Sequence, residues 1–251
     1  MENIFKSSLV ILVLILSGCA SSTDNYSDPN DPFESLNRAT YSFNKAIDSA
    51  VLKPVAKGYD TVAPEPFKVG VSNFFSNLGE LPTIINGLLQ GKFNNAFSDT
   101  ARFVINSTLG IAGLIDVATD LGLDEHDEDF GQTLGAWGFD SGSYLMLPFL
   151  GPTTVRDIFG VPIDGYLSFS RQVDHVPTKN TLYLFRLVDL RYRLLAIDGQ
   201  LDDALDEYSF VKDAFLMRRE YQVYDGNPPE EDDFYDDDCE YDEDCYDEII
   251  D

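Results

Sequence analysis

Residues 71–104, VSNFFSNLGELPTIINGLLQGKFNNAFSDTARFV, decide the fold that we predict for this chain. A first apolar stripe has the three- and four-residue spacing of one helix face: Val71, Phe74, Phe75, Leu78 and Leu81. Pro82 interrupts this stripe before it resumes at Ile84, Ile85, Leu88 and Leu89. Gly91 then turns the chain into a third stripe: Phe93, Phe97, Ala101 and Val104. The stretch predicts a kinked helical hairpin with wide apolar faces.

The segments around the hairpin also favour helices. Asp31 and Pro32 are typical of a cap and a first helical position, and apolar spacing continues to Ile47. Residues 110–165 are rich in Gly and Pro, which predicts short helices and ordered loops, whereas 182–197 and 201–221 predict two longer helices. Strand signals are weak. We therefore expect a mainly α protein with one domain over residues 31–224, long enough for one sizeable core.

The amino-terminal end predicts export and lipidation. Residues 1–18 combine Lys6 with an apolar run from Leu9 to Leu16, as in a signal peptide. The run makes only about 12 Å of helix, too short for a hydrocarbon core about 30 Å thick, which argues against a membrane anchor. Leu16-Ser17-Gly18-Cys19 resembles the bacterial lipobox, so Cys19 is the predicted lipidation site. Ala20, in place of Asp, favours the outer membrane by resemblance to bacterial sorting rules.

Two polar segments flank the predicted body. Residues 19–30 form a flexible tether whose polar part reaches roughly 18 Å. Residues 225–251 hold 15 acidic residues and no Lys or Arg, so we expect a disordered acidic tail. Cys239 and Cys245 lie in this tail; a disulfide is the favoured prediction, and a metal site the alternative. The formal charge of -27 argues against a nucleic-acid partner.

Catalytic and cofactor motifs are not evident. His126 and His175 lie in loops, and no G-x-S-x-G elbow accompanies them. The acidic run over residues 124–129 lacks the spacing of a calcium loop, so a solvated loop is favoured over a cation site. We predict no enzyme activity, no cofactor and no metal in the body.

An ordered set of motifs resembles one family. Four motifs stand in the same order as in the MlaA (VacJ) family of outer-membrane lipoproteins. They are Asp31-Pro32-Phe33-Glu34-Ser35-Leu36-Asn37-Arg38, Leu88-Leu89-Gln90-Gly91, Phe130-Gly131-Gln132-Thr133-Leu134-Gly135 and Arg218-Arg219. The likeness covers about residues 31–221. Ser143 departs from the family's Gly-Pro-Tyr turn and Glu207 from its Asp-Pro-Tyr turn, which puts only local turn geometry in doubt. The tail has no counterpart.

The resemblance implies a ring-like helical body embedded in the outer membrane, facing the periplasm and containing an amphipathic channel. It implies a passive conduit that removes phospholipid from the outer leaflet and maintains lipid asymmetry, with a trimeric porin and a periplasmic lipid carrier as partners. Candidate channel or lipid contacts are Phe74, Phe75, Leu78, Trp137, Tyr144 and Leu147. Candidate phosphate or ion-pair residues are Arg38, Arg102, Arg156 and Arg186. Core packing, helix caps and ion pairs are the alternative roles for these residues.

Two other functions compete with the conduit. A non-transporting lipoprotein could scaffold an envelope complex or bind another protein, and an esterase is a more distant alternative because a catalytic set is missing. Without an energy source, a passage follows the gradient that its partners maintain, so the sequence does not fix the direction of lipid flow.

Overall fold

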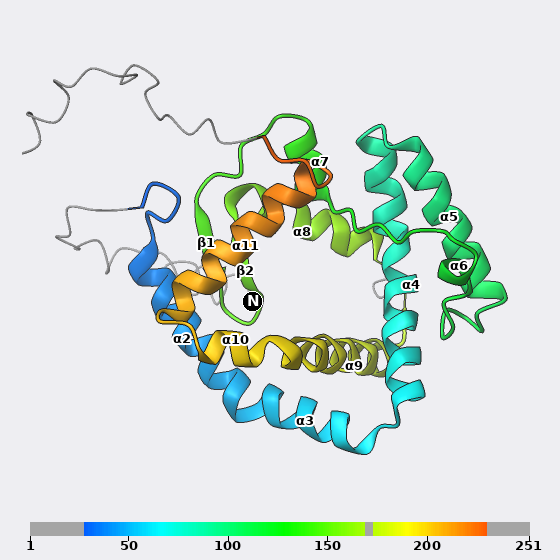
Figure 1. Cartoon of the computed structure of the whole chain (residues 1–251), viewed down its shortest axis with the longest axis horizontal. Coiled ribbons are helices and arrows are strands. Elements are labelled where there is room, and N and C mark those ends of the chain that lie inside the picture. The colour runs from blue at the N-terminus through cyan, green and yellow to red at the C-terminus, as the bar shows by residue number, and fades with distance from the viewer. Residues whose placement is uncertain (1–27, 169–172, 230–251) are drawn as a thin grey trace, which may run out of the picture.

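Helices arranged as a ring make up most of this computed structural model, which describes residues 28–168 and 173–229 (Figure 1). The chain begins with α2 (Glu34–Ile47), a π-helical turn (Asp48–Leu52) and α3 (Lys53–Val62). The hairpin follows as α4 (Glu65–Leu89) and α5 (Phe93–Thr108). Cys19, Cys239, Cys245, the signal peptide and most of the tether and tail lie outside the described residues.

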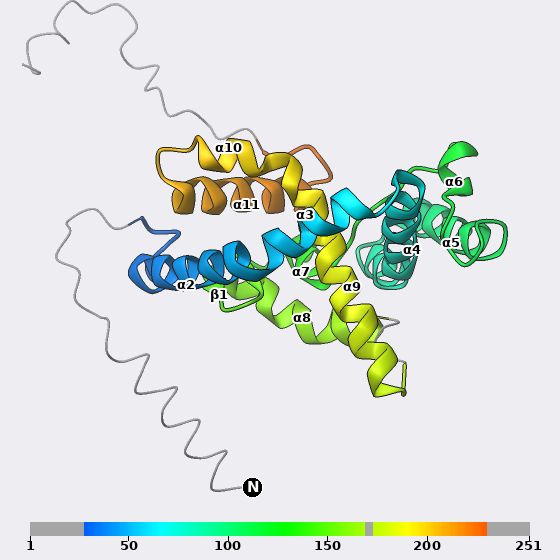
Figure 2. The ribbon, with the colours of Figure 1, turned by 90° about the horizontal axis from the view of Figure 1, so that it is seen from below.

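The second half returns across the ring in shorter elements. They are α6 (Val117–Asp120), α7 (Phe130–Ala136), the strands β1 (Tyr144–Leu147) and β2 (Gly151–Thr154), and α8 (Val155–Leu167). The chain then forms α9 (Val176–Leu194), a 3-10 turn (Leu195–Ile197), α10 (Asp198–Asp202) and α11 (Glu207–Val223). In the view turned by 90° from that of Figure 1, α10 and α11 lie together on one side of α2, and α8 lies on the other (Figure 2). The mainly helical prediction is confirmed.

Local sequence explains where several helices begin. The side chains of Asp116, Asp129, Thr154 and Asp206 accept hydrogen bonds from backbone N–H groups in the first turns of α6, α7, α8 and α11. Proline occupies one of the first two positions of α3, α4 and α9, where its missing N–H costs no helical hydrogen bond. These caps and prolines fix where one helix begins after another, so that the chain changes direction between helices and follows the ring.

Four details of the helix prediction were wrong. The helix α4 continues through Pro82 without interruption, and the amide of Asn86 donates to the Pro82 carbonyl. Asp31 does not cap α2, because its buried carboxylate binds Asn37 and Tyr208 instead. The expected last helix is divided before Asp206, which caps α11. A short antiparallel hairpin, β1 with β2, was not foreseen; Tyr144 pairs with Thr154 in its register.

A small core lies where α2, the strand pair and α11 meet. Tyr144, Met146 and Tyr208 are buried there, and Asn37 links α2 to β1 by donating to the Tyr144 carbonyl and accepting from the Met146 N–H. Across the described residues, buried polar and charged side chains outnumber buried apolar ones. This proportion is the reverse of that in ordinary water-soluble domains.

The helix α5 makes the reversal clearest. Its apolar stripe points outward, with Phe93 58%, Phe97 70% and Val104 53% exposed. Its buried face instead carries Asp99, Arg102 and Asn106, together with Ala96, which packs against Gly87 of α4. An apolar exterior of this extent is typical of a surface that contacts lipid or another protein. No helix among the described residues is long and apolar enough to cross a bilayer.

Candidate functional site

A cavity of about 510 Å³ lies between α4, α9, α11 and the loop that precedes α7, and we call it the α4–α9 cavity. Each element contributes one face. The helix α4 presents residues 75–83, α9 presents residues 186–194, and α11 presents Arg218. The loop adds residues 125–127. Because these elements are far apart in sequence, the cavity exists only when the ring is closed.

A buried polar contact fixes the crossing of α4 and α9. The hydroxyl of Ser72 donates to Asp189 Oδ1 at 2.7 Å, and Asp189 is 1% exposed. Arg193, one turn further along α9, approaches Asp189 Oδ2 at 3.2 Å. The carboxylate therefore joins both helices and holds one cavity-lining arginine in place.

The lining combines apolar and charged side chains. Phe75, Leu190 and Leu194 provide apolar surface, while Arg186, Arg193 and Arg218 provide three guanidinium groups. Glu125 and Asp127 face the same space from the loop. Arg186 forms no ion pair with any described residue, and Arg218 has only a 3.6 Å contact with the exposed Asp127. The charges of Arg186 and Arg218 are therefore available to a ligand.

A buried charge cluster forms the wall behind the cavity. Glu80 and Arg102 are both nearly inaccessible, and Arg102 Nε lies 3.3 Å from Glu80 Oε1. Arg102 also binds Asp116 Oδ2 at 3.1 Å and donates to Thr119. Burial, with the nearby charge of Asp99, raises the pKa of Glu80 to about 7. Asp116 is also desolvated, but hydrogen bonds from Thr119, Asn106 and Arg102 lower its pKa to about 2.

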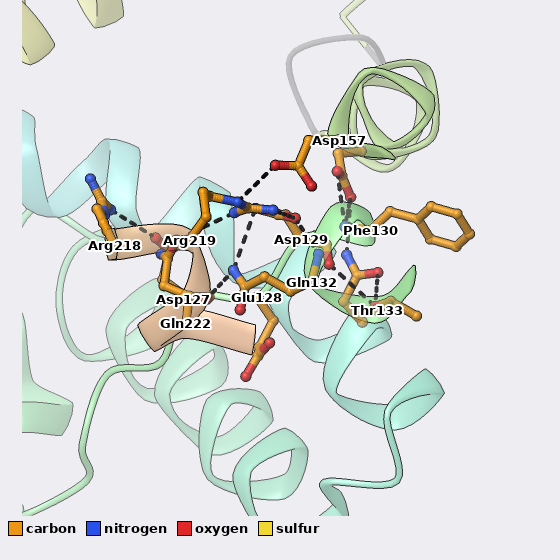
Figure 3. Close-up of polar contacts among 12 residues, drawn as sticks. Asp127, Glu128, Asp129, Phe130, Gln132, Thr133, Asp157, Arg218, Arg219 and Gln222 are labelled. Atoms are coloured by element: carbon orange, nitrogen blue, oxygen red, sulfur yellow. Dashed lines mark hydrogen bonds and ion pairs between the residues drawn. The ribbon is translucent and has the colours of Figure 1, made fainter. Parts of the chain in front are cut away.

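The acidic run over residues 124–129 is a hub of ion pairs, which the expectation of a solvated loop did not include (Figure 3). Asp129 receives a two-pronged contact from Arg219, whose Nε also lies 2.9 Å from Asp157. Glu128 pairs with Lys92 at 2.8 Å, and His126 Nδ1 lies 2.7 Å from Asp99. The run therefore joins α5, α7, α8 and α11. No group of three metal-binding side chains suits a metal ion among the described residues.

Of the predicted arginines, Arg186 alone lines the α4–α9 cavity. Arg38 lies outside, in ion pairs with Glu34 and Asp206 and over the ring of Tyr208. Arg102 is inside the buried cluster, and Arg156 pairs with its neighbour Asp157 at 3.0 Å. These three contacts are ion pairs, the alternative role named for them above.

The predicted aromatic and aliphatic contacts are scattered. Phe75 lines the cavity; Phe74 and Leu78 are half-buried on the same helix. Trp137 is half-exposed outside the cavity, with its indole N–H donating to the Leu89 carbonyl at 3.1 Å. Tyr144 is fully buried in the core, so a lipid could not reach it in this conformation, and Leu147 is half-buried in β1.

Sequence reasoning missed several lining residues. Arg193 and Arg218 fall on helices that were expected, but their direction depends on how the ring closes. Arg193 is seven residues beyond Arg186, two helical turns along the same face, and this spacing was the available signal. Glu125 and Asp127 belong to the acidic run that was expected to be a solvated loop, and Glu80 carried no such pattern.

The fold and site together define a class of protein: a helical ring, apolar outside and charged within, suited to the boundary between lipid and water. Comparison with known proteins identifies the family. The model of the MlaA lipoprotein family matches residues 29–222, and the chain belongs to this family.

Individual relatives agree with this assignment. The chain is 34% identical to the intermembrane phospholipid transport system lipoprotein MlaA of Haemophilus influenzae, over 86% of this chain and 89% of the relative. It is 34% identical to the protein of the same name from Escherichia coli, over 86% and 87% of the two chains. A solved structure described as a structural basis for maintenance of bacterial outer membrane lipid asymmetry matches with a TM-score of 0.69 and 32% identity. That match covers 77% of this chain and 98% of the other.

Proposed function

We propose that this protein is an outer-membrane lipoprotein of the intermembrane phospholipid transport system, and that it removes phospholipid from the outer leaflet through a passive amphipathic passage. The α4–α9 cavity is the observation that carries the proposal, since it places guanidinium groups beside apolar side chains inside a ring with an apolar exterior. Family membership and the names of the relatives support the same activity.

The physical problem in moving a phospholipid is its head group. A charged group that enters hydrocarbon without partners costs several kcal/mol. Arg186, Arg193 and Arg218 would replace lost water contacts of the phosphate, while Phe75, Leu190 and Leu194 accept the adjoining methylene groups. Such a passage lowers the barrier without covalent chemistry, so we propose no enzyme activity for this chain.

Filling the cavity separates a conduit from a scaffold. A Cβ added at Gly79 meets nothing within 4 Å, and Gly79 lines the cavity, so Gly79→Trp should obstruct it without a clash at its first side-chain atom. We expect this variant to fail in a deletion strain: outer-leaflet phospholipid, measured by amine labelling of intact cells, should stay as high as without the gene.

The matched control is Gly199→Trp, which adds the same side chain in α10 away from the cavity, where a Cβ also meets nothing within 4 Å. It should restore lipid asymmetry. Full rescue by Gly79→Trp, at an equal amount of protein, would favour the scaffold. If the deletion strain itself has a normal outer leaflet, the proposed transport function is lost.

The position at the membrane is proposed to depend on Cys19, whose lipid would tether the body to the periplasmic side of the outer membrane. An acyl anchor contributes about 0.8 kcal/mol per buried CH₂, so three chains hold essentially irreversibly. Cys19→Ser should therefore give an unlipidated protein that does not complement the deletion, as judged by membrane fractionation and detergent sensitivity. Cys239→Ser is the control and should complement; complementation by both variants would contradict the anchoring model.

The partners proposed from the family resemblance are a trimeric porin and a periplasmic lipid carrier. The apolar outer surface of α5 and the loop after it, including Phe97, Leu109 and Ile111, supports contact with lipid or with a membrane protein. Chemical crosslinking in intact cells followed by purification tests these partners: recovery of neither a porin nor a carrier would count against them.

A further inference from the structure

We propose that the α4–α9 cavity contains a head-group site for zwitterionic phospholipid, in which Arg186 and Arg193 bind the phosphate and the loop carboxylates Glu125 and Asp127 bind a primary ammonium group. This inference rests on the proposed transport function and names the lipid class that its passage prefers. It follows from the way the two signs of charge are distributed around one cavity.

The cationic side of the site is on α9. Arg186 and Arg193 lie seven residues apart on one helix face, and both line the cavity. Arg186 forms no ion pair among the residues that the structure describes, whereas Arg193 is held by Asp189 and remains 45% exposed. A guanidinium group presents parallel N–H donors that match two oxygens of a phosphate. Arg186 can therefore bind a phosphodiester without breaking an ion pair, and Arg193 can add its exposed N–H groups while it stays bound to Asp189.

The anionic side comes from the loop before α7. Glu125 and Asp127 are exposed and line the same cavity, and Arg218, 3.6 Å from Asp127, is the one Lys or Arg within ion-pair distance of either carboxylate among the described residues. At this distance and exposure such a contact contributes little, about 0–1 kcal/mol. A ligand ammonium group could therefore compete with Arg218 for these carboxylates.

Because arginines and carboxylates line the same cavity, a purely anionic head group is disfavoured. Its phosphate would gain the same arginine contacts, but its hydroxyl groups would not compensate the loop carboxylates, and its net charge would be repelled by them. A phosphoethanolamine head group satisfies both sides. The cavity volume of about 510 Å³ lies within the range for sites that hold small organic ligands, about 300–1,000 Å³.

The choice of a primary ammonium group follows from the residues around the carboxylates. Three N–H donors can bind oxygens directly, whereas a quaternary ammonium group has none and is usually recognised by aromatic rings. The aromatic rings in the lining are Phe75 on α4 and the imidazole of His126, which is bound to Asp99, so the cavity residues do not form a cage of Phe, Tyr or Trp rings.

The test uses the purified full-length lipoprotein mixed with detergent-dispersed phosphatidylethanolamine and phosphatidylglycerol of equal chain composition and amount. Bound lipid is released and quantified by mass spectrometry. The wild type should retain phosphatidylethanolamine over phosphatidylglycerol by about threefold to tenfold, the range expected for one or two weak charged contacts. Equal retention of the two lipids would overturn the zwitterion site while leaving transport intact.

Two variants separate the two halves of the site. Arg186→Gln should lower retention of both lipids, because both carry a phosphate. Glu125→Gln with Asp127→Asn should instead remove or reverse the preference while total lipid is kept. Lys57→Gln is the matched control for Arg186→Gln, since Lys57 is exposed on α3 outside the cavity. Unchanged binding in Arg186→Gln, or an unchanged preference in the loop variant, would contradict the proposal.

The proposed function can fail independently of this site. A wild-type protein that shows the lipid preference in vitro, but whose deletion leaves the outer leaflet normal, would retain the binding site and lose the transport role. Conversely, a deletion strain with accumulated phospholipid and a wild type that binds both lipids equally would retain transport and lose the head-group site. Far-UV circular dichroism of each variant confirms that the fold is present before binding is compared.

Discussion

Replacing Arg219 with Met should lower the free energy of unfolding by about 3–5 kcal/mol, the range for a buried ion pair that loses one partner. The Arg219 guanidinium bridges Asp129 of the segment before α7 and Asp157 of α8 (Figure 3). Without it Asp129 loses its paired cation, and Asp157 keeps only its contact with Arg156. Burial raises the pKa of Asp129, but the hydrogen bonds from Arg219 outweigh this effect and hold it below its usual value.

The neighbouring arginine provides the control. Arg218 is 70% exposed and makes one 3.6 Å contact, so Arg218→Met should change the unfolding free energy by less than about 1 kcal/mol. Both variants are compared by denaturant titration in the same detergent, followed by circular dichroism. Equal losses for the two substitutions would show that Arg219 does not hold α11 to α7 and α8.

Replacing Arg102 with Met should have a similarly large effect, about 3–5 kcal/mol, because Glu80 and Asp116 would both lose their buried cation. The effect should depend on pH. The pKa of Glu80 is raised to about 7 in the folded protein, above the usual 4.5. The free energy of unfolding is therefore highest below about pH 4.5, and it falls as the pH rises through about 7 and Glu80 becomes ionised in the folded state. The loss in Arg102→Met should therefore be greater at pH 8 than at pH 5.

A second substitution isolates Glu80. Glu80→Gln added to Arg102→Met should recover on the order of 1–3 kcal/mol at pH 8, where it removes an unpaired charge, and little at pH 5, where the carboxyl is already neutral in the folded protein. Denaturant titration of the two variants at both pH values measures the difference. A recovery that is equal at pH 5 and pH 8 would exclude ionisation of Glu80 as its cause.

The sequence was sufficient to predict elements whose signal is local. The α4–α5 hairpin follows from residue spacing and from the turn at Gly91, where φ is +78°. Pro82 was given too much weight: a proline removes one helical hydrogen bond, and packing of α4 on α5 along most of the hairpin compensates for that loss. Four-residue strands such as β1 are too short to produce a recognisable alternation.

The site was predictable only in part, for a different reason. Periodicity identifies the apolar face of α5 but does not say whether that face packs in the core or points outward. Phe97 was therefore predicted correctly to lie on an apolar stripe, but periodicity could not show that this stripe points outward. Arg186 was one of four arginines predicted to bind phosphate or form ion pairs, and of these four it is the one that lines the cavity. Arg218 could not be assigned to the cavity, because only closure of the ring brings α11 near α9.

The outward-facing apolar stripe of α5 makes the stability of the folded protein depend on the medium around it. Phe93, Phe97 and Val104 gain little from folding in water, because the folded state leaves more than half of each exposed. Contact with hydrocarbon, or with an apolar surface of another protein, would remove these side chains from water and so add to the stability of the folded state. In water the same side chains form an apolar surface that favours association with lipid or protein.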